Sequence, residues 1–199
     1  MDIYLTKKIG KWVESVDSFT VGKLMGKGFA CIHHYHNVCL DLTMLRAASE
    51  RWDLTRHVFH FNQCKLCPML KEFAALMNNN NFRFTLLPPK PRRALDECLG
   101  IPYSLGKTWL KGGVNLRTLV EYFKEKRDNE YYFCALLTAI LAGFFLVGDF
   151  EAMDPKIIDI TAMLCTDNLV PMILAKTLNG LDDLKDGVCD YFKGSPLLL

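Results

Sequence analysis

The chain has 199 residues, of which 50% are hydrophobic and 12% aromatic, so it is long and apolar enough to bury a core and is not a disordered chain. Its net charge of +2 is too small to indicate a nucleic-acid or membrane partner by itself. The charge is unevenly distributed, because residues from Asp149 onward carry nine acids and four lysines, a net charge of −5, and the preceding residues therefore carry +7. Such charge runs are usually solvated surface, and a weak preference of the first three-quarters of the chain for polyanions remains the alternative.

Eight cysteines are spread along the chain, and no secretory signal precedes them, because the N-terminus lacks an apolar core of useful length. This distribution predicts reduced, mostly buried thiols in an intracellular protein. They are Cys31, Cys39, Cys64, Cys67, Cys98, Cys134, Cys165 and Cys189.

Residues 1–28 are expected to form an N-terminal helix and a glycine-containing linker, ahead of a single domain over 29–199. Apolar residues at helical spacing predict the helix over 3–16, and the glycines at positions 22, 26 and 28 indicate the linker. Residues 29–40 combine apolar side chains with histidines and do not favour one state.

The next segment predicts the one β-structure of the chain. Asp41 can cap a helix over 42–52, and an alternating pattern then predicts a hairpin over about 57–67. Pro68 suits the first turn of a helix over 69–77. Three prolines predict an extended segment over 82–91.

The second half reads as helices around one apolar stretch. We expect a loop over 100–113, followed by helices over 115–127, 155–165 and 171–178. With one or two turns over 92–99, the chain totals seven or eight helices and one small hairpin. The absence of strand–helix alternation predicts a mainly α fold.

The stretch 131–147 holds seventeen residues without a charge. A membrane-spanning helix needs about 20 apolar residues, so this run is at the lower edge and leaves a single-pass membrane protein as an alternative. Gly143 and Gly148 interrupt or end the run, and neighbouring helices have apolar faces that need a partner. The sequence therefore favours a buried central helix.

Cys64 and Cys67 have the spacing of half a zinc site, and His57 and His60 lie nearby in the sequence. These four residues are weak metal candidates, because the hairpin that carries them is too short to surround an ion alone. A zinc-binding or nucleic-acid-associated factor, using them and the basic N-terminal part, is one alternative function.

The remaining motifs argue against an enzyme, and we expect no catalytic residues and no cofactor. The segment from Gly100 to Thr108 resembles a phosphate-binding loop, but five residues separate its glycines and no strand precedes it. No serine stands in a nucleophile elbow. A Cys–His pair such as Cys31 with His33 stays open, although residues so close in sequence are more often simply neighbours. Asp182, Asp183 and Asp186 are expected on a solvated face.

The order of several segments resembles the plant mobile domain, also called aminotransferase-like, and related plant domains of unknown function in transposon-derived proteins. The similarity covers about residues 30–199. It rests on the helix ending in Trp52-Asp53, the hairpin of Phe59 and Phe61, the helix from Pro68, the apolar helix from Phe133, and the segments 169–179 and 192–198. Met69, Lys71 and the asparagine run 78–81 depart from the family pattern, and the family's last helix is missing.

The resemblance implies a mainly helical domain in which Trp52, Phe59, Phe61 and Phe73 belong to the core. It also implies an intracellular protein of the nucleus, linked to genome maintenance or transposon silencing. The pyridoxal-phosphate enzyme that the aminotransferase-like label suggests has no support here, since no strand-borne lysine with its partners is recognisable. The sequence thus predicts a non-enzymatic interaction domain with a protein partner, possible nucleic-acid binding and no membrane.

Overall fold

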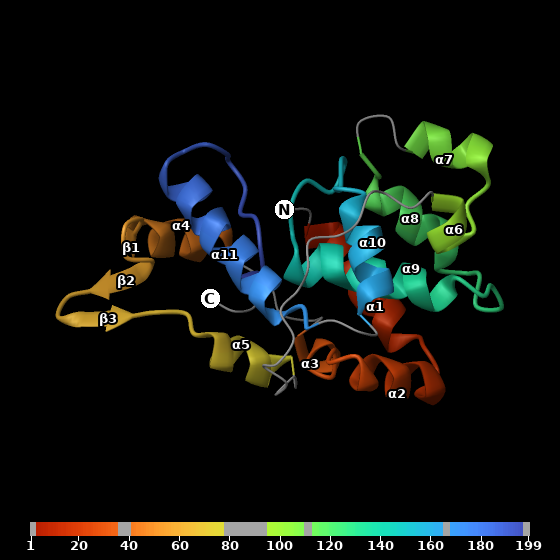
Figure 1. The fold of residues 1–199 in the computed structure, drawn as a ribbon, viewed down its shortest axis with the longest axis horizontal. Helices are drawn as coiled ribbons and strands as arrows, with labels where there is room; N and C mark the ends of the chain where they lie inside the picture. The colour runs from red at the N-terminus through yellow and green to blue at the C-terminus, as the bar shows by residue number, and fades with distance from the viewer. Residues whose placement is uncertain (1–2, 36–40, 78–94, 110–112, 165–167, 197–199) are drawn as a thin grey trace.

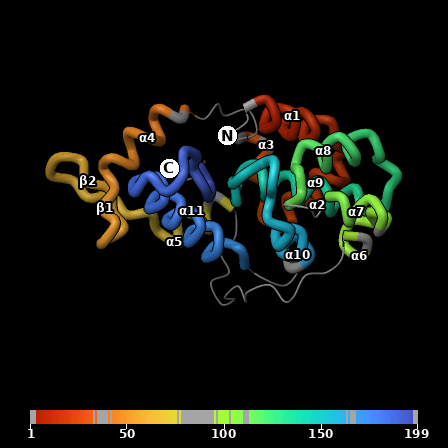
Figure 2. The backbone as a smooth tube through the Cα atoms, turned by 90° about the horizontal axis from the view of Figure 1, so that it is seen from above, coloured from red at the N-terminus to blue at the C-terminus, as the bar shows by residue number. Residues whose placement is uncertain are grey.

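The computed structural model describes residues 3–35, 41–77, 95–109, 113–164 and 168–196, and it is mainly helical with one small antiparallel sheet (Figure 1). The predicted fold class is therefore confirmed. The predicted extended segment 82–91 lies outside the described residues. A tube view shows the sheet at one end of an elongated molecule and α6 and α7 at the other (Figure 2).

The helices follow the predicted order with shifted boundaries. They are α1 (Ile3–Glu14), α2 (Ser18–Gly26), α3 (Ile32–Tyr35), α4 (Leu42–Glu50), α5 (Leu70–Leu76), α6 (Leu95–Leu99), α7 (Tyr103–Trp109), α8 (Leu116–Phe123), α9 (Tyr132–Ile140), the π-helical η1 (Leu141–Phe145), α10 (Lys156–Met163) and α11 (Val170–Lys185). The predicted helix over 171–178 thus continues to Lys185.

The sheet has the order β1 (Trp52–Asp53), β2 (Val58–Phe61) and β3 (Cys64–Leu66), all antiparallel. The pairing of Phe61 with Cys64 confirms the predicted hairpin and places its tight turn at Asn62-Gln63. Asn62 has a φ of 54°, a left-handed conformation that asparagine tolerates better than most residues. The short strand β1, which pairs Trp52 with Phe59, was not predicted.

The central helix consists of α9 continued by η1, and every residue from Ala135 to Val147 is buried. Helices α1, α6, α8 and α10 all contact it. The prediction of a buried central helix is confirmed. Within the described residues, no helix is both long and apolar enough to cross a membrane.

Helices α1 and α2 both contribute side chains to the main core. Leu5, Ile9 and Trp12 on α1 are buried, and the Trp12 indole N–H donates a 2.7 Å hydrogen bond to the Tyr132 hydroxyl on α9. The predicted glycine linker is in fact largely the helix α2. The Asp17 carboxylate caps this helix by accepting from the Thr20 amide at 2.7 Å, and this cap outweighs the helix-weakening glycines.

The expected loop over 100–113 contains helix α7, so that prediction was wrong. The Pro102 carbonyl accepts from the amides of Leu105 and Gly106 at 2.9 and 2.8 Å, which starts the helix. Gly106 lies within this helix, and a Cβ atom at this position would make only ordinary van der Waals contact, 3.5 Å from Leu95 Cβ. This glycine therefore does not mark a turn.

Two hydrophobic cores share helix α11. Its first half contributes Val170 and Ile173 to the main core around α9. Its second half contributes Leu181 to a smaller core under the sheet. The other members of the smaller core are Leu45, Trp52, Phe59 and Phe192. Phe61, predicted as core, is instead 43% exposed, because it lies at the outer end of the hairpin.

The C-terminal segment 191–196 joins the central helix to α11. Gly194 pairs with Val147 through two backbone hydrogen bonds of 2.9 and 3.0 Å. The Ser195 amide donates to the Thr177 hydroxyl at 2.9 Å, and the Ser195 hydroxyl donates to the Phe144 carbonyl at 3.1 Å. The segment approaches α11 so closely that a Cβ on Gly180 would overlap the Lys193 carbonyl.

Substituting Gly180→Ala is therefore expected to destabilise the fold by about 3 kcal/mol, since backbone must move to make room. Urea unfolding followed by circular dichroism measures this. Gly22→Ala is the matched control, because Gly22 lies in helix α2 and a Cβ there meets nothing within 4 Å. That control is expected to stabilise by about 0.5 kcal/mol. Equal effects of the two substitutions would contradict the close approach of 191–196 to α11.

Candidate functional site

Asp182 on α11 holds the sheet against the helices. One of its carboxylate oxygens accepts a 2.7 Å hydrogen bond from the Trp52 indole N–H, and the other lies 3.2 Å from His57 Nε2. The His57 and Trp52 rings stack with centroids 5.7 Å apart. Trp52 is buried, so the carboxylate satisfies an indole N–H that water cannot reach.

A second polar group braces the turn between β1 and β2. The Asp53 carboxylate accepts from the amides of Thr55 and Arg56 at 2.9 and 3.0 Å and from the Arg56 guanidinium at 3.1 Å. These donors, the Arg56 amide first among them, lower the pKa of Asp53. His60 Nε2 is 3.3 Å from Asp53 Oδ2, but the geometry is not that of a hydrogen bond.

The four metal candidates are not brought together. Among the described residues, no three His, Cys, Asp or Glu side chains form a group that could hold a metal ion. His57 and His60 face different carboxylates, Asp182 and Asp53. The Cys67 thiol lies 3.6 Å from the His57 carbonyl oxygen, a backbone contact. His57 and His60 thus lie beside carboxylates, and Cys67 lies beside backbone carbonyls.

Neither candidate for catalysis gains support from geometry. Burial raises the pKa of the Cys31 thiol to about 11, which suppresses the reactive thiolate. The side chain of His33 lies outside the described residues. The segment that resembled a phosphate-binding loop forms helix α7, so its backbone amides serve the helix.

One of the three basic residues of α1 is used in an ion pair. Lys8 on α1 makes a 2.7 Å ion pair with Glu121 on α8, whereas Lys7 and Lys11 are exposed. A second group of basic residues in the sequence lies outside the described residues. It comprises Arg83, Lys90, Arg92 and Arg93.

The sheet and the start of α5 present an exposed apolar surface. It consists of Phe61 on β2, Leu66 on β3, and Met69 and Leu70 at the start of α5, and we call it the hairpin patch. Phe61 stacks on the buried Phe59 with centroids 6.1 Å apart, and Phe59 is paired with Leu66 across the strands. One apolar face thus runs from the core to the solvent.

Sequence reasoning missed Asp182 and the exposure of Phe61. Asp182 was expected on a solvated face with Asp183 and Asp186. In the structure Asp183 also has a partner, since its carboxylate accepts from Lys193 at 2.7 Å. The signal that could have found Asp182 was the buried Trp52, whose indole N–H needs an acceptor.

The chain was compared with protein-family models, curated proteins and solved structures. No family model matches the chain, and no curated protein or solved structure matches it significantly. The resemblance to the plant mobile domain therefore stays a prediction from the order of the motifs.

Asp182→Ala is expected to lower the free energy of unfolding by about 2 kcal/mol, because it leaves the buried Trp52 N–H without its acceptor. Urea unfolding monitored by tryptophan fluorescence measures the change. Asp186→Ala, one turn further along and exposed, serves as control and is expected to change stability by less than about 0.5 kcal/mol. If both variants lost the same stability, the bracing role of Asp182 would be wrong.

The difference between the Cys31 thiol and the exposed thiols should appear as a difference in alkylation rate. At pH 8 iodoacetamide should alkylate Cys31 about 100-fold more slowly than an ordinary exposed thiol, because its raised pKa leaves little thiolate. The exposed Cys64 and Cys67 provide the internal comparison. Mass spectrometry of the native protein at timed intervals resolves the sites. Equal rates at Cys31 and Cys64 would show that Cys31 is not shielded.

Proposed function

We propose that the chain is a non-enzymatic protein-interaction domain that binds a protein partner through the hairpin patch. The resemblance supplies the setting of this proposal: a plant domain of transposon-derived type, acting in the nucleus in genome maintenance or transposon silencing. The observation that carries the proposal is the projection of the hairpin, with its apolar side chains exposed, beyond the helical body.

Figures 1 and 2 show the β2–β3 hairpin extending from the end of the molecule. All three residues of β3 are exposed, and in the described sheet its outer edge pairs with no further strand. Leu66 and Met69 are 57% and 52% exposed, which is unusual for side chains that continue a core face. Contiguous exposed apolar surface of this kind is typical of protein-binding sites.

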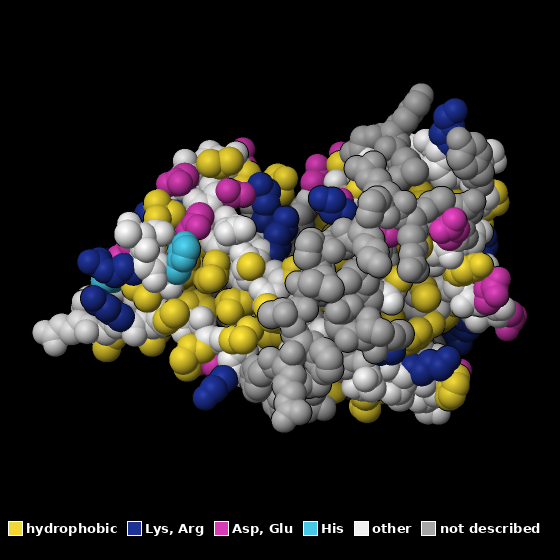
Figure 3. All heavy atoms as spheres, viewed as in Figure 1, with side chains coloured by type: hydrophobic (Ala, Val, Ile, Leu, Met, Phe, Trp, Pro, Cys, Tyr) yellow, Lys and Arg dark blue, Asp and Glu magenta, His cyan; other side chains and the backbone are white. Residues whose placement is uncertain are grey.

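The charges beside the patch favour an acidic partner. Lys65 on β3 and Lys71 on α5, the sequence neighbours of Leu66 and Leu70, are both exposed. A space-filling view shows hydrophobic side chains along this end of the molecule, with Lys and Arg side chains at its rim (Figure 3). A partner that offers apolar side chains flanked by carboxylates would complement both features.

The polar side chains under the patch support a binding role. Asp182 and Asp53 accept hydrogen bonds from side chains and amides of the sheet itself. Their oxygens are thus used to hold the hairpin in position. A rigid support of this kind reduces the entropy that a binding surface loses when it meets a partner.

The test uses a Phe61→Ser/Leu66→Ser variant of the full chain. Proteins captured from plant nuclear extract by the wild type are produced in pure form, and their affinity is measured by calorimetry. The substitution should weaken binding of the true partner at least about tenfold, because two central apolar contacts are lost. Circular dichroism verifies that both proteins are folded.

A Phe19→Ser/Met25→Ser variant is the matched control. It removes two exposed apolar side chains from α2, away from the hairpin. Its affinity for the purified partner should equal that of the wild type. A partner that binds the hairpin variant as tightly as the wild type, or loses affinity equally for both variants, would rule out the hairpin patch as the binding surface.

A further inference from the structure

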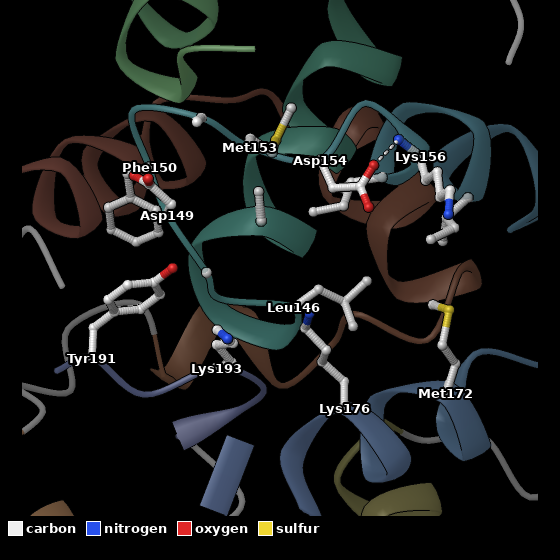
Figure 4. A pocket seen from close by; sticks show the side chains of 15 residues that line it. Leu146, Asp149, Phe150, Met153, Asp154, Lys156, Met172, Lys176, Tyr191 and Lys193 are labelled. Carbon is white, nitrogen blue, oxygen red and sulfur yellow. Dashed lines mark hydrogen bonds between the residues drawn. The ribbon is translucent and has the colours of Figure 1, made fainter. Parts of the chain in front are cut away.

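A cavity of about 340 Å³ lies between the central helix, the segment 148–154, α10, α11 and the C-terminal segment (Figure 4). Its volume is in the range of small-molecule sites. It is formed by parts of the chain far apart in the sequence, and the hairpin patch contributes none of its lining.

Most of the lining is apolar. Leu146, Phe150, Met153 and Ile157 are buried side chains that face this space, and Met172 of α11 closes one side. The wall at Ala142 belongs to η1, where the chain makes a π-helical turn. Such turns in a helix often occur at functional sites.

Lysines reach the cavity from three different elements: Lys156 from α10, Lys176 from α11 and Lys193 from the C-terminal segment. Lys193 is paired with Asp183. The ammonium groups of Lys156 and Lys176 make no ion pair or hydrogen bond with the described residues. Figure 4 shows Lys176 and Lys193 on one wall with Tyr191, below Leu146.

The two carboxylates of the lining lie on the opposite wall (Figure 4). Asp149 accepts from the Glu151 amide at 2.9 Å, and Asp154 accepts from the Lys156 amide at 3.0 Å, so each is engaged by the turn that it begins. The cavity therefore carries Lys176 and Lys193 on one wall and two carboxylates on the other, with an apolar body between them. The space-filling view also shows Lys and Arg side chains at the notch between the part that contains the sheet and the part that contains the main core (Figure 3).

We propose that this cavity binds a small carboxylate with an apolar body, such as a medium-chain or aromatic acid. The carboxylate lies against Lys176 and Lys193, where ammonium groups and the Tyr191 hydroxyl can donate to it. The apolar body displaces water from the surface of Leu146, Met153 and Met172. This site is independent of the hairpin patch and of the proposed protein partner.

The experiment titrates the full chain with decanoate and follows heat together with the methyl resonances of the methionines. One saturable site with a Kd below about 1 mM is expected. The Met153 and Met172 methyl resonances should shift on binding, because both residues line the cavity. The exposed Met25 and Met44, elsewhere on the surface, should keep their positions. Decanol, which lacks the charge, should bind at least about tenfold more weakly.

Lys176→Met should weaken decanoate binding about tenfold, while leaving the fold intact, since Lys176 is exposed. Lys107→Met on α7 changes the net charge equally at a distant exposed position and should leave the affinity unchanged. The proposal is overturned if the wild type shows no saturable binding, if decanol binds as tightly, or if the two lysine variants lose equal affinity. Failure here would leave the hairpin patch untouched, because its test does not involve the cavity.

Discussion

The complete burial of residues 135–147 is the constraint on which the rest of the structure depends. Each large apolar side chain in this stretch gains roughly 1.5–3 kcal/mol on burial, provided that no face of the helix remains in water. One neighbour cannot cover every face, so the covering comes from α1, α8, α10 and the C-terminal segment. The positions of α1 and of the C-terminal segment 191–196 both follow from this requirement.

The end of the central helix also decides how the main core and the smaller core under the sheet are joined. A helix that ends inside a core leaves carbonyl groups that water cannot reach, and these need donors from elsewhere. The Ser195 hydroxyl satisfies the Phe144 carbonyl, while the Ser195 amide is held by Thr177 of α11. The contact among Phe144, Thr177 and Ser195 therefore completes the central helix and fixes α11. This helix carries Leu181 and Asp182 beneath the sheet.

The sequence was informative where one local pattern decides the structure. The charge-free run 131–147 predicted the central helix, and the alternation from His57 to Phe61 predicted the hairpin. It was misleading at Gly106, which read as a loop residue but lies within helix α7. It was uninformative where a tertiary contact decides, since Asp182 read as solvated but accepts a hydrogen bond from Trp52. The cavity could not be predicted, because Lys156, Lys176 and Lys193 meet only through the packing of separate elements.

Helix α11 connects the two candidate binding surfaces, because it carries Lys176 at the cavity and Asp182 under the hairpin. The six-residue step from Lys176 to Asp182 spans about 9 Å of helix. Energetic coupling between sites requires an element with two discrete arrangements. Gly180 presses against the Lys193 backbone and Thr177 is hydrogen-bonded to Ser195, so this part of α11 is held in one arrangement. A rigid connection of this kind keeps both surfaces in place while transmitting little between them. The rigidity of α11 thus predicts that the two proposed binding sites act independently of each other.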